Sequence, residues 1–461
     1  MSDNTVKADT DARRARYELM TKTPVPELIL RMAFPTIISM LVTGIYNTAD
    51  TFFVGQISTQ ATAAVGLVFS VMAIIQALGF FCGHGSGNYI SRMLGAGEQQ
   101  EADEMASTGF ALSLILGGVV AALGIIFLTP LSLLVGATPT TLEDTRTYMR
   151  IILLGAPFMM AQFVINNQLR FQGSAMYAMF GLLSGAIVNI GLDPLLIFVF
   201  HLGVAGAAIA TISGQIMSFI VLLIGSMRGP NIRLSVGNVR LNSHYLAEIT
   251  NGGIPSLFRQ GLAAVSTLLL NTAAGNLGGD AAIAGMSVTT RVTMLLLSAL
   301  IGFGQGYQPV CSFNYGAGLK RRVRDGYVFC VKWGTVFLTI IAVLCFAFAP
   351  QIIGWFRDDP EVIAVGRVAL RCQAVALPLA AIITMTNMML QSMGRGVKAS
   401  ITASAKNGIF FIPLILILPR ILGLTGVEIT QAIADVLSAA LAIPLAVSEL
   451  RLMKKDDPVE A

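Results

Sequence analysis

Charged side chains are scarce in this sequence, and their scarcity excludes an ordinary soluble protein. They make up 12% of the 461 residues, whereas soluble chains carry roughly 25%. Hydrophobic residues make up 55%, the mean hydropathy is +0.74, and the apolar residues fall in long blocks. Many blocks reach about 20 residues, which is the length that a helix needs to cross a bilayer. The sequence therefore predicts an all-α polytopic membrane protein whose main partner is the lipid bilayer.

Several motifs that would carry enzymatic or cofactor chemistry are also missing. The sequence has no G-x-x-x-x-G-K-[ST] phosphate loop, no H-E-x-x-H and no G-x-S-x-G, so we expect neither ATP hydrolysis nor hydrolase chemistry. Its five scattered cysteines and three histidines do not form a disulfide or zinc framework. We expect no cofactor, no structural metal and no removable signal peptide. An intramembrane enzyme is only a remote alternative.

The apolar runs predict twelve transmembrane helices in two lobes. We expect a tail at 1–27, an N-lobe at 28–227, a linker at 228–243, a C-lobe at 244–450 and a second tail at 451–461. The predicted spans are 28–54, 61–91, 104–134, 141–168, 174–200, 204–227, 244–274, 281–312, 322–354, 361–390, 398–419 and 425–450.

Basic residues follow every second span, which sets the expected orientation. They lie before the first span and after spans two, four, six, eight, ten and twelve, at Arg13, Arg14, Arg16, Lys22, Arg92, Arg170, Arg228, Arg233, Arg240, Lys320, Arg321, Arg322, Arg324, Arg395, Lys398, Arg451, Lys454 and Lys455. Basic short loops stay cytoplasmic, so we expect both termini inside. The net charge of +5 is mostly this topology signal, and we expect no nucleic-acid partner.

The two halves of the chain repeat one another at a shift of 220 or 221 residues. AFPTI (33–37) matches GIPSL (253–257), LGAG (94–97) matches YGAG (315–318), and LGVAG (202–206) matches LGLTG (422–426). Each half has an even number of predicted spans, so the lobes are parallel repeats. In transporters built from such repeats the substrate site lies between them near the midplane of the membrane.

Polar residues interrupt the apolar runs of the N-lobe. Asp50 lies about 22 residues into the first span, where a wet position at the helix end is the alternative to a buried one. Asn189 and Asp193 lie at i and i+4 on one helix face, and Pro194 removes a backbone donor there. Thr211 follows on the next span. Such oxygen groups suit a hard cation, and the carboxylates could instead carry a proton.

These residues resemble a known family. ADTFFVG in the first span, N-x-x-x-D-P in the fifth, Thr211 in the sixth and the repeated G-A-G are similar to the MATE family of multidrug and toxic compound extrusion transporters. IPSLFRQG in the seventh span resembles its MepA-like bacterial branch. The resemblance implies that Asp50, Asn189, Asp193 and Thr211 bind H⁺ or Na⁺. It also implies a monomeric secondary exporter of lipophilic organic cations in the bacterial inner membrane.

The C-lobe departs from this pattern. Leu270 and Ile412 stand where the repeat would place partners of Asp50 and Asp193, so we expect no second cation site. We expect the buried C-lobe charges to pair with one another, with direct substrate contact as the alternative; they are Arg259, Arg291, Lys406, Glu428 and Asp435. Gln260, Gln162 and Asn166 are further candidates for the cavity wall or for ties between helices.

Two functions remain open from the sequence. The first is ion-coupled export of organic cations by alternating access. The second is a flippase or exporter for a lipid-linked or amphiphilic solute on a related twelve-helix fold, because Arg259, Arg291 and Lys406 could hold phosphate.

Overall fold

The computed structural model describes residues 3–228 and 231–455, and almost all of them are helical. The N-lobe follows the terminal helix α1 (Asp3–Lys22) and contains α2 (Val25–Gly55), α3 (Thr59–Ala96), α4 (Gln99–Ile126), α5 (Leu128–Leu134), α6 (Leu142–Phe171), α7 (Ala175–Pro194), η1 (Leu195–Val199) and α8 (Gly203–Ser226). A short 3-10 turn, η2 (Val236–Asn238), lies in the linker.

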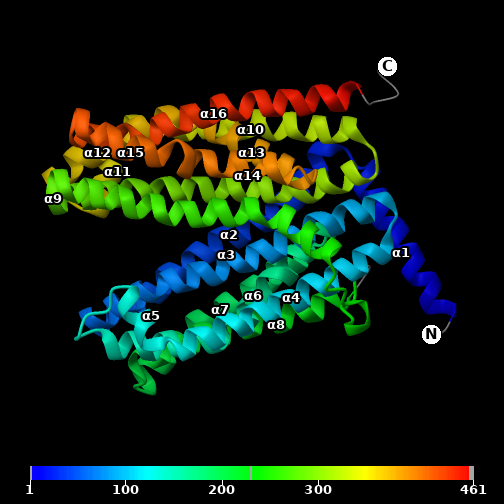
Figure 1. Ribbon diagram of the computed structural model, residues 1–461, viewed down its shortest axis with the longest axis horizontal. Coiled ribbons are helices and arrows are strands. Elements are labelled where there is room, and N and C mark those ends of the chain that lie inside the picture. Colours follow the sequence, from blue (N-terminus) through cyan, green and yellow to red (C-terminus); the bar gives the residue numbers. More distant parts are fainter. Residues whose placement is uncertain (1–2, 229–230, 456–461) are drawn as a thin grey trace.

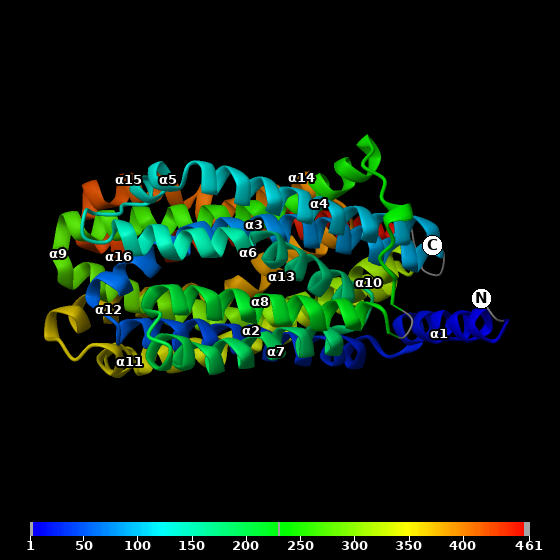
Figure 2. The ribbon, with the colours of Figure 1, turned by 90° about the horizontal axis from the view of Figure 1, so that it is seen from below.

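The C-lobe begins with a very long element, α9 (Ser243–Gly316). After it come α10 (Lys320–Ala347), α11 (Ala349–Phe356), α12 (Pro360–Ala376), α13 (Leu379–Ser392), α14 (Gly396–Ser404), η3 (Ala405–Ile409), α15 (Phe411–Leu422) and α16 (Leu424–Lys455). Figures 1 and 2 show the long helices running side by side with both termini at one end, and Figure 1 shows the two lobes converging toward that end. We call this the terminal end.

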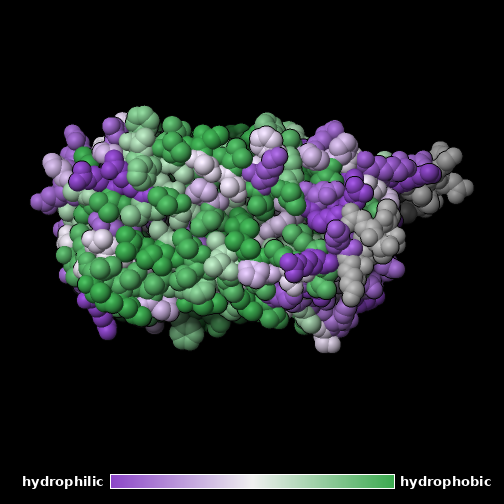
Figure 3. Space-filling model, turned by 90° about the horizontal axis from the view of Figure 1, so that it is seen from above, coloured by the Kyte–Doolittle hydropathy of each residue, from purple (hydrophilic) through white to green (hydrophobic). Residues whose placement is uncertain are grey.

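The described residues provide twelve spans, in agreement with the prediction. Ten helices are long and apolar enough to cross a membrane, and the pair α12 and α13, bent by 56°, forms one more broken span. α9 supplies two spans because its backbone leaves the helical conformation at Gly279, where φ is +60°. A broad apolar band covers the middle of the molecule, and hydrophilic side chains gather at its ends (Figure 3).

The internal repeat is visible in the backbone and in a matched pair of hydrogen bonds. Positive φ angles occur at Gly97, Gly173 and Gly203 and again at their repeat partners Gly318, Gly394 and Gly423. The Nδ2 of Asn166 donates to the carbonyl of Ala178 at 2.9 Å, and the Nδ2 of Asn387 donates to that of Ala399 at 2.6 Å. Asn387 and Ala399 each lie 221 residues after their counterparts in the first pair. Each lobe therefore joins its fourth span to its fifth in the same way.

The lobes contact one another mainly through α2 and α3 on one side and α9 on the other. The contact is tightest at the terminal end, where two glycines let backbones touch. A Cβ on Gly95 would lie 2.9 Å from the carbonyl carbon of Phe313, and one on Gly316 would lie 2.7 Å from that of Arg92. Real Cβ atoms do not approach backbone atoms so closely. The structure is therefore closed at the terminal end.

The terminal helix and the linker both attach to the bundle at this end. Asn314 donates to the carbonyl of Met20 at 3.1 Å, and Arg322 donates to that of Thr23 at 2.6 Å, so the end of α1 is held by the C-lobe. The linker lies on the N-lobe. Its Ile232 amide donates to Gln172 at 2.7 Å, and its Arg240 amide donates to Thr108 at 2.8 Å.

Candidate functional site

Three N-lobe helices bring the predicted cation-binding residues to one place. Asp50 comes from α2, Asn189 and Asp193 from α7, and Thr211 from α8. All four side chains are buried, with exposed fractions of 5%, 3%, 0% and 4%. Asp50 and Asp193 lie close enough to interact electrostatically. Asp50 is thus a buried residue and not a wet one at a helix end.

A change of helix geometry follows Asp193 directly. α7 ends at Pro194, and the next turn, η1, is a π-helix. Proline lacks the N–H that would continue the α-helical ladder, and π-turns in helices frequently occur at functional sites. This irregular turn lies directly beside the Asp193 carboxylate.

The polar atoms of this cluster lack partners within the protein. Both oxygens of Asp193, both polar atoms of the Asn189 side chain and one oxygen of Asp50 are buried and make no hydrogen bond to any described residue. Leaving a buried polar atom unpaired typically costs about 1–3 kcal/mol, and more for a charged group. Four of these five atoms are oxygens and the fifth is the amide nitrogen of Asn189, so the cluster is a candidate cation-binding site.

Two tyrosines complete the cluster, and sequence reasoning missed both. The buried Tyr148 of α6 interacts electrostatically with Asp50 and Asp193 and lies beside Thr211. Its hydroxyl has no hydrogen-bond partner among the described residues. Tyr46 lies one turn before Asp50, within its electrostatic range and next to Gln215. Only the i, i+4 spacing of Tyr46 and Asp50 could have indicated a role for Tyr46, because a tyrosine in an apolar span is usually interpreted as a packing residue.

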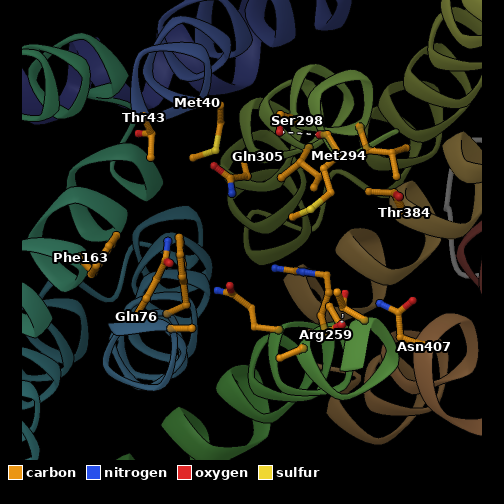
Figure 4. A pocket seen from close by; sticks show the side chains of 18 of the residues that line it. Met40, Thr43, Gln76, Phe163, Arg259, Met294, Ser298, Gln305, Thr384 and Asn407 are labelled. Atoms are coloured by element: carbon orange, nitrogen blue, oxygen red, sulfur yellow. Dashed lines mark hydrogen bonds between the residues drawn. The ribbon is translucent and has the colours of Figure 1, made fainter. Parts of the chain in front are cut away.

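A cavity of about 600 Å³ lies between the lobes. Asn189 and Thr211 line it, whereas Asp50 and Asp193 are not among its lining residues. The carboxylates therefore lie behind the N-lobe wall, and Asn189 and Thr211 connect them to the cavity. Gln162, Asn166, Arg259, Gln260 and Lys406 also line it. Figure 4 shows side chains from both lobes projecting into this space.

Hydrogen bonds between the lobes close the cavity on its terminal side. The Nδ1 of His84, on α3, lies 2.8 Å from the Oγ of Ser256 on α9. Its Nε2 lies 3.2 Å from Arg170, which also donates to Gln305 on α9. The described residues contain no group of three or more potential metal ligands. His84 is thus placed as a hydrogen-bonding residue that joins the lobes.

The C-lobe charges do not form the single network that the sequence suggested. Lys406 and Asp435 are paired at 3.4 Å. Arg259 instead donates to Asn387 at 3.1 Å. Arg291 lines a separate pocket with Asp280, Arg357, Asp359 and Glu361, and no ion pair is found for Glu428 among the described residues. The reason is the bend of α9 at Gly279. It places Arg259 and Arg291 on different arms, at distances from the bend that differ by about 12 Å.

Two arginines assigned to basic loops are in fact interior residues. Arg170 is 2% exposed, lies inside α6 and bonds to three polar side chains. Arg92 lies inside α3 and pairs with Glu248 of α9 at 2.9 Å. The helices run further than the apolar blocks, so these side chains reach the lobe interface, where they hold the lobes together.

The fold and site define a polytopic membrane protein with two similar lobes around a polar cavity. The MatE family model matches residues 35–195 and 255–417, and the chain belongs to this family. Multidrug export protein MepA of Staphylococcus aureus (strain MSSA476) is 30% identical over 426 residues, which cover 92% of this chain and 93% of that protein. The corresponding protein of Staphylococcus haemolyticus is 29% identical over 418 residues, which cover 90% of this chain and 92% of that protein.

Solved structures show the same architecture. A MATE crystal structure in a bent conformation has a TM-score of 0.90 at 27% identity, covering 95% of this chain and 98% of that one. A MOP superfamily transporter from Pyrococcus furiosus, described as having a binding pocket of reversed polarity, has a TM-score of 0.89 at 26% identity with the same coverage.

Proposed function

We propose that this protein is a secondary multidrug exporter that exchanges lipophilic organic cations for H⁺ or Na⁺ across a bacterial inner membrane. The observation that carries the proposal is the cluster of buried, unpartnered oxygens at Asp50, Asn189 and Asp193. The family membership and the exporter relatives support it. The cavity is of a size that suits drug-like molecules.

The coupling follows from the chemistry of the cluster. Two carboxylates close together in a dry site repel one another, and a proton or a bound Na⁺ relieves that repulsion. Carboxylate, amide and hydroxyl oxygens are the ligands that hard cations prefer. Because Asn189 and Thr211 also line the cavity, an ion arriving behind them changes the wall that a cationic substrate contacts. Substrate and ion then compete, so their exchange is coupled.

Reconstituted protein in vesicles tests the proposal. Efflux of the organic cation rhodamine 123 is followed with a pH gradient and then with a Na⁺ gradient. We expect Asp50→Asn and Asp193→Asn to abolish gradient-driven efflux, because the amide keeps the shape and loses the exchangeable charge. Asp435→Asn, in the C-lobe, is the matched control and should keep its ion dependence. The coupling site lies in the other lobe if Asp193→Asn transports normally while Asp435→Asn loses its ion dependence.

A further inference from the structure

The two walls of the cavity differ in charge. The charged side chains that line it are Arg259 and Lys406, both from the C-lobe, and no described acidic residue lines it. Lys406 is balanced by its ion pair with Asp435. Arg259 has no carboxylate within ion-pair distance among residues 3–228 and 231–455. The C-lobe wall therefore carries positive charge that the protein itself does not balance.

A second arginine adds to this charge. Arg170 lies near enough to Arg259 for the two cations to repel one another. Its partners are Gln305, Asn167 and His84, none of which is acidic. A buried charge is costly unless a charge of opposite sign accompanies it. Arg259 lines the cavity and Arg170 does not, so Arg170 adds to the positive charge near the terminal side of the cavity without facing the cavity itself.

The Arg259 guanidinium is also held in a fixed direction. One terminal nitrogen donates to the Oδ1 of Asn387 at 3.1 Å and the other to the Oγ of Ser256 at 3.5 Å. Asn387 is itself oriented, because its Nδ2 donates to Ala399 and to Thr402. Guanidinium has five N–H donors, so donors remain, and Figure 4 shows the group pointing into the open space.

We propose that the C-lobe wall is an anion subsite, centred on Arg259, for the acidic group of an amphiphilic substrate. Carboxylate, sulfonate and phosphate all fit, because guanidinium binds each of them through paired hydrogen bonds. The N-lobe has no matching subsite, since Ser39 and Gly185 occupy the repeat positions equivalent to Arg259 and Lys406. The inference rests on the proposed export function and refines it. The preferred substrates carry their cationic group toward the N-lobe carboxylates and an acidic group toward Arg259.

A pair of dyes that differ only at the acidic group tests this. Rhodamine 110 has a free carboxylate, and rhodamine 123 is its methyl ester. Binding of each dye to purified protein in non-ionic detergent is measured by fluorescence anisotropy. We expect the acid to bind about tenfold more tightly than the ester, which is the size of one charge-assisted hydrogen bond. Arg259→Gln should bring the ratio of the two affinities close to one.

Control variants and lipid additions sharpen the result. Arg291→Gln, outside the cavity, should keep the wild-type ratio, and Arg259→Lys should keep part of it. Displacement of rhodamine 110 by phosphatidylglycerol, but not by phosphatidylcholine, would identify a lipid headgroup as a source of the anion. If wild-type protein binds the ester as tightly as the acid, the subsite does not exist, whatever the variants do. If vesicles export neither dye, it is the export function that fails.

Discussion

The backbone contact at the terminal end of the lobe interface gives a direct test of alternating access. Gly95→Ala and Gly316→Ala each add one methyl group where it would meet a backbone carbonyl of the other lobe. Neither methyl group has a flexible side chain to push aside. The lobes must therefore separate at this end to accommodate either substitution.

The size of the effect follows from the cost of overpacking. Inserting a methyl group into a tightly packed contact typically costs about 1–3 kcal/mol, and each 1.4 kcal/mol is a factor of ten in population. Each variant should therefore increase the population open at the terminal end by about 5- to 150-fold. The double variant should shift the population further, by up to the product of the two factors, because both clashes destabilise the closed state and separation of the lobes relieves both.

Cys311 is a native reporter for this opening. It is fully buried on α9, close to Arg92, and its alkylation by a water-soluble maleimide can be followed by mass spectrometry. Its rate should rise by the same factor, while the equally buried Cys330 serves as an internal control. Gly261→Ala on the same helix, where nothing lies within 4 Å of the new Cβ, should change nothing. If Cys311 stays as unreactive as Cys330 in folded Gly95→Ala protein, the contact does not govern closure.

Three further predictions follow from the same structure. A cysteine at Asp280 should react with an impermeant thiol reagent from outside the cell, and one at Asn238 should not; the reverse pattern would invert the topology. His84→Gln should keep substantial transport without metal dependence, and transport restored only by Zn²⁺ would contradict a hydrogen-bonding role. Lys406→Met should lower stability by about 1–3 kcal/mol by leaving the Asp435 carboxylate unpaired. Adding Asp435→Leu should recover part of that loss in thermal unfolding, and no recovery would argue against the pair.

The twelve spans and the two lobes were predictable because they depend on long-range averages. The length of a hydrophobic run and the repeated Pro and Gly positions can be recognised even when the helix boundaries are slightly misplaced. Local backbone irregularities were harder to predict. Nothing in Leu195–Val199 indicates a π-turn beyond the preceding proline, and the helix of Asp3–Lys22 is too polar to appear as a span. Its ordering depends on hydrogen bonds from Asn314 and Arg322, which lie about 300 residues away.

The candidate site was predictable where one lobe carries a residue that its repeat lacks. Asp50 and Asp193 stood out against Leu270 and Ile412 in this way, and the structure places the two carboxylates together. The interior role of Arg170 was not predictable. A basic residue near the end of a span has the same appearance in a loop as in a buried helix, and only its contacts with the other lobe distinguish the two.

The glycine contact at the terminal end also bears on ancestry. Gly95 faces Phe313, and Gly316 faces Arg92; displaced by 221 residues, the first pair becomes the second with the lobes exchanged. Such reciprocity is the property of an isologous interface, in which two copies of one chain present the same patch to each other. A six-span chain would insert both copies in one orientation and could form this contact with itself. Gene duplication and fusion would account for this reciprocity, and the halves now differ, with Asp50 and Asp193 in one and Arg259 in the other.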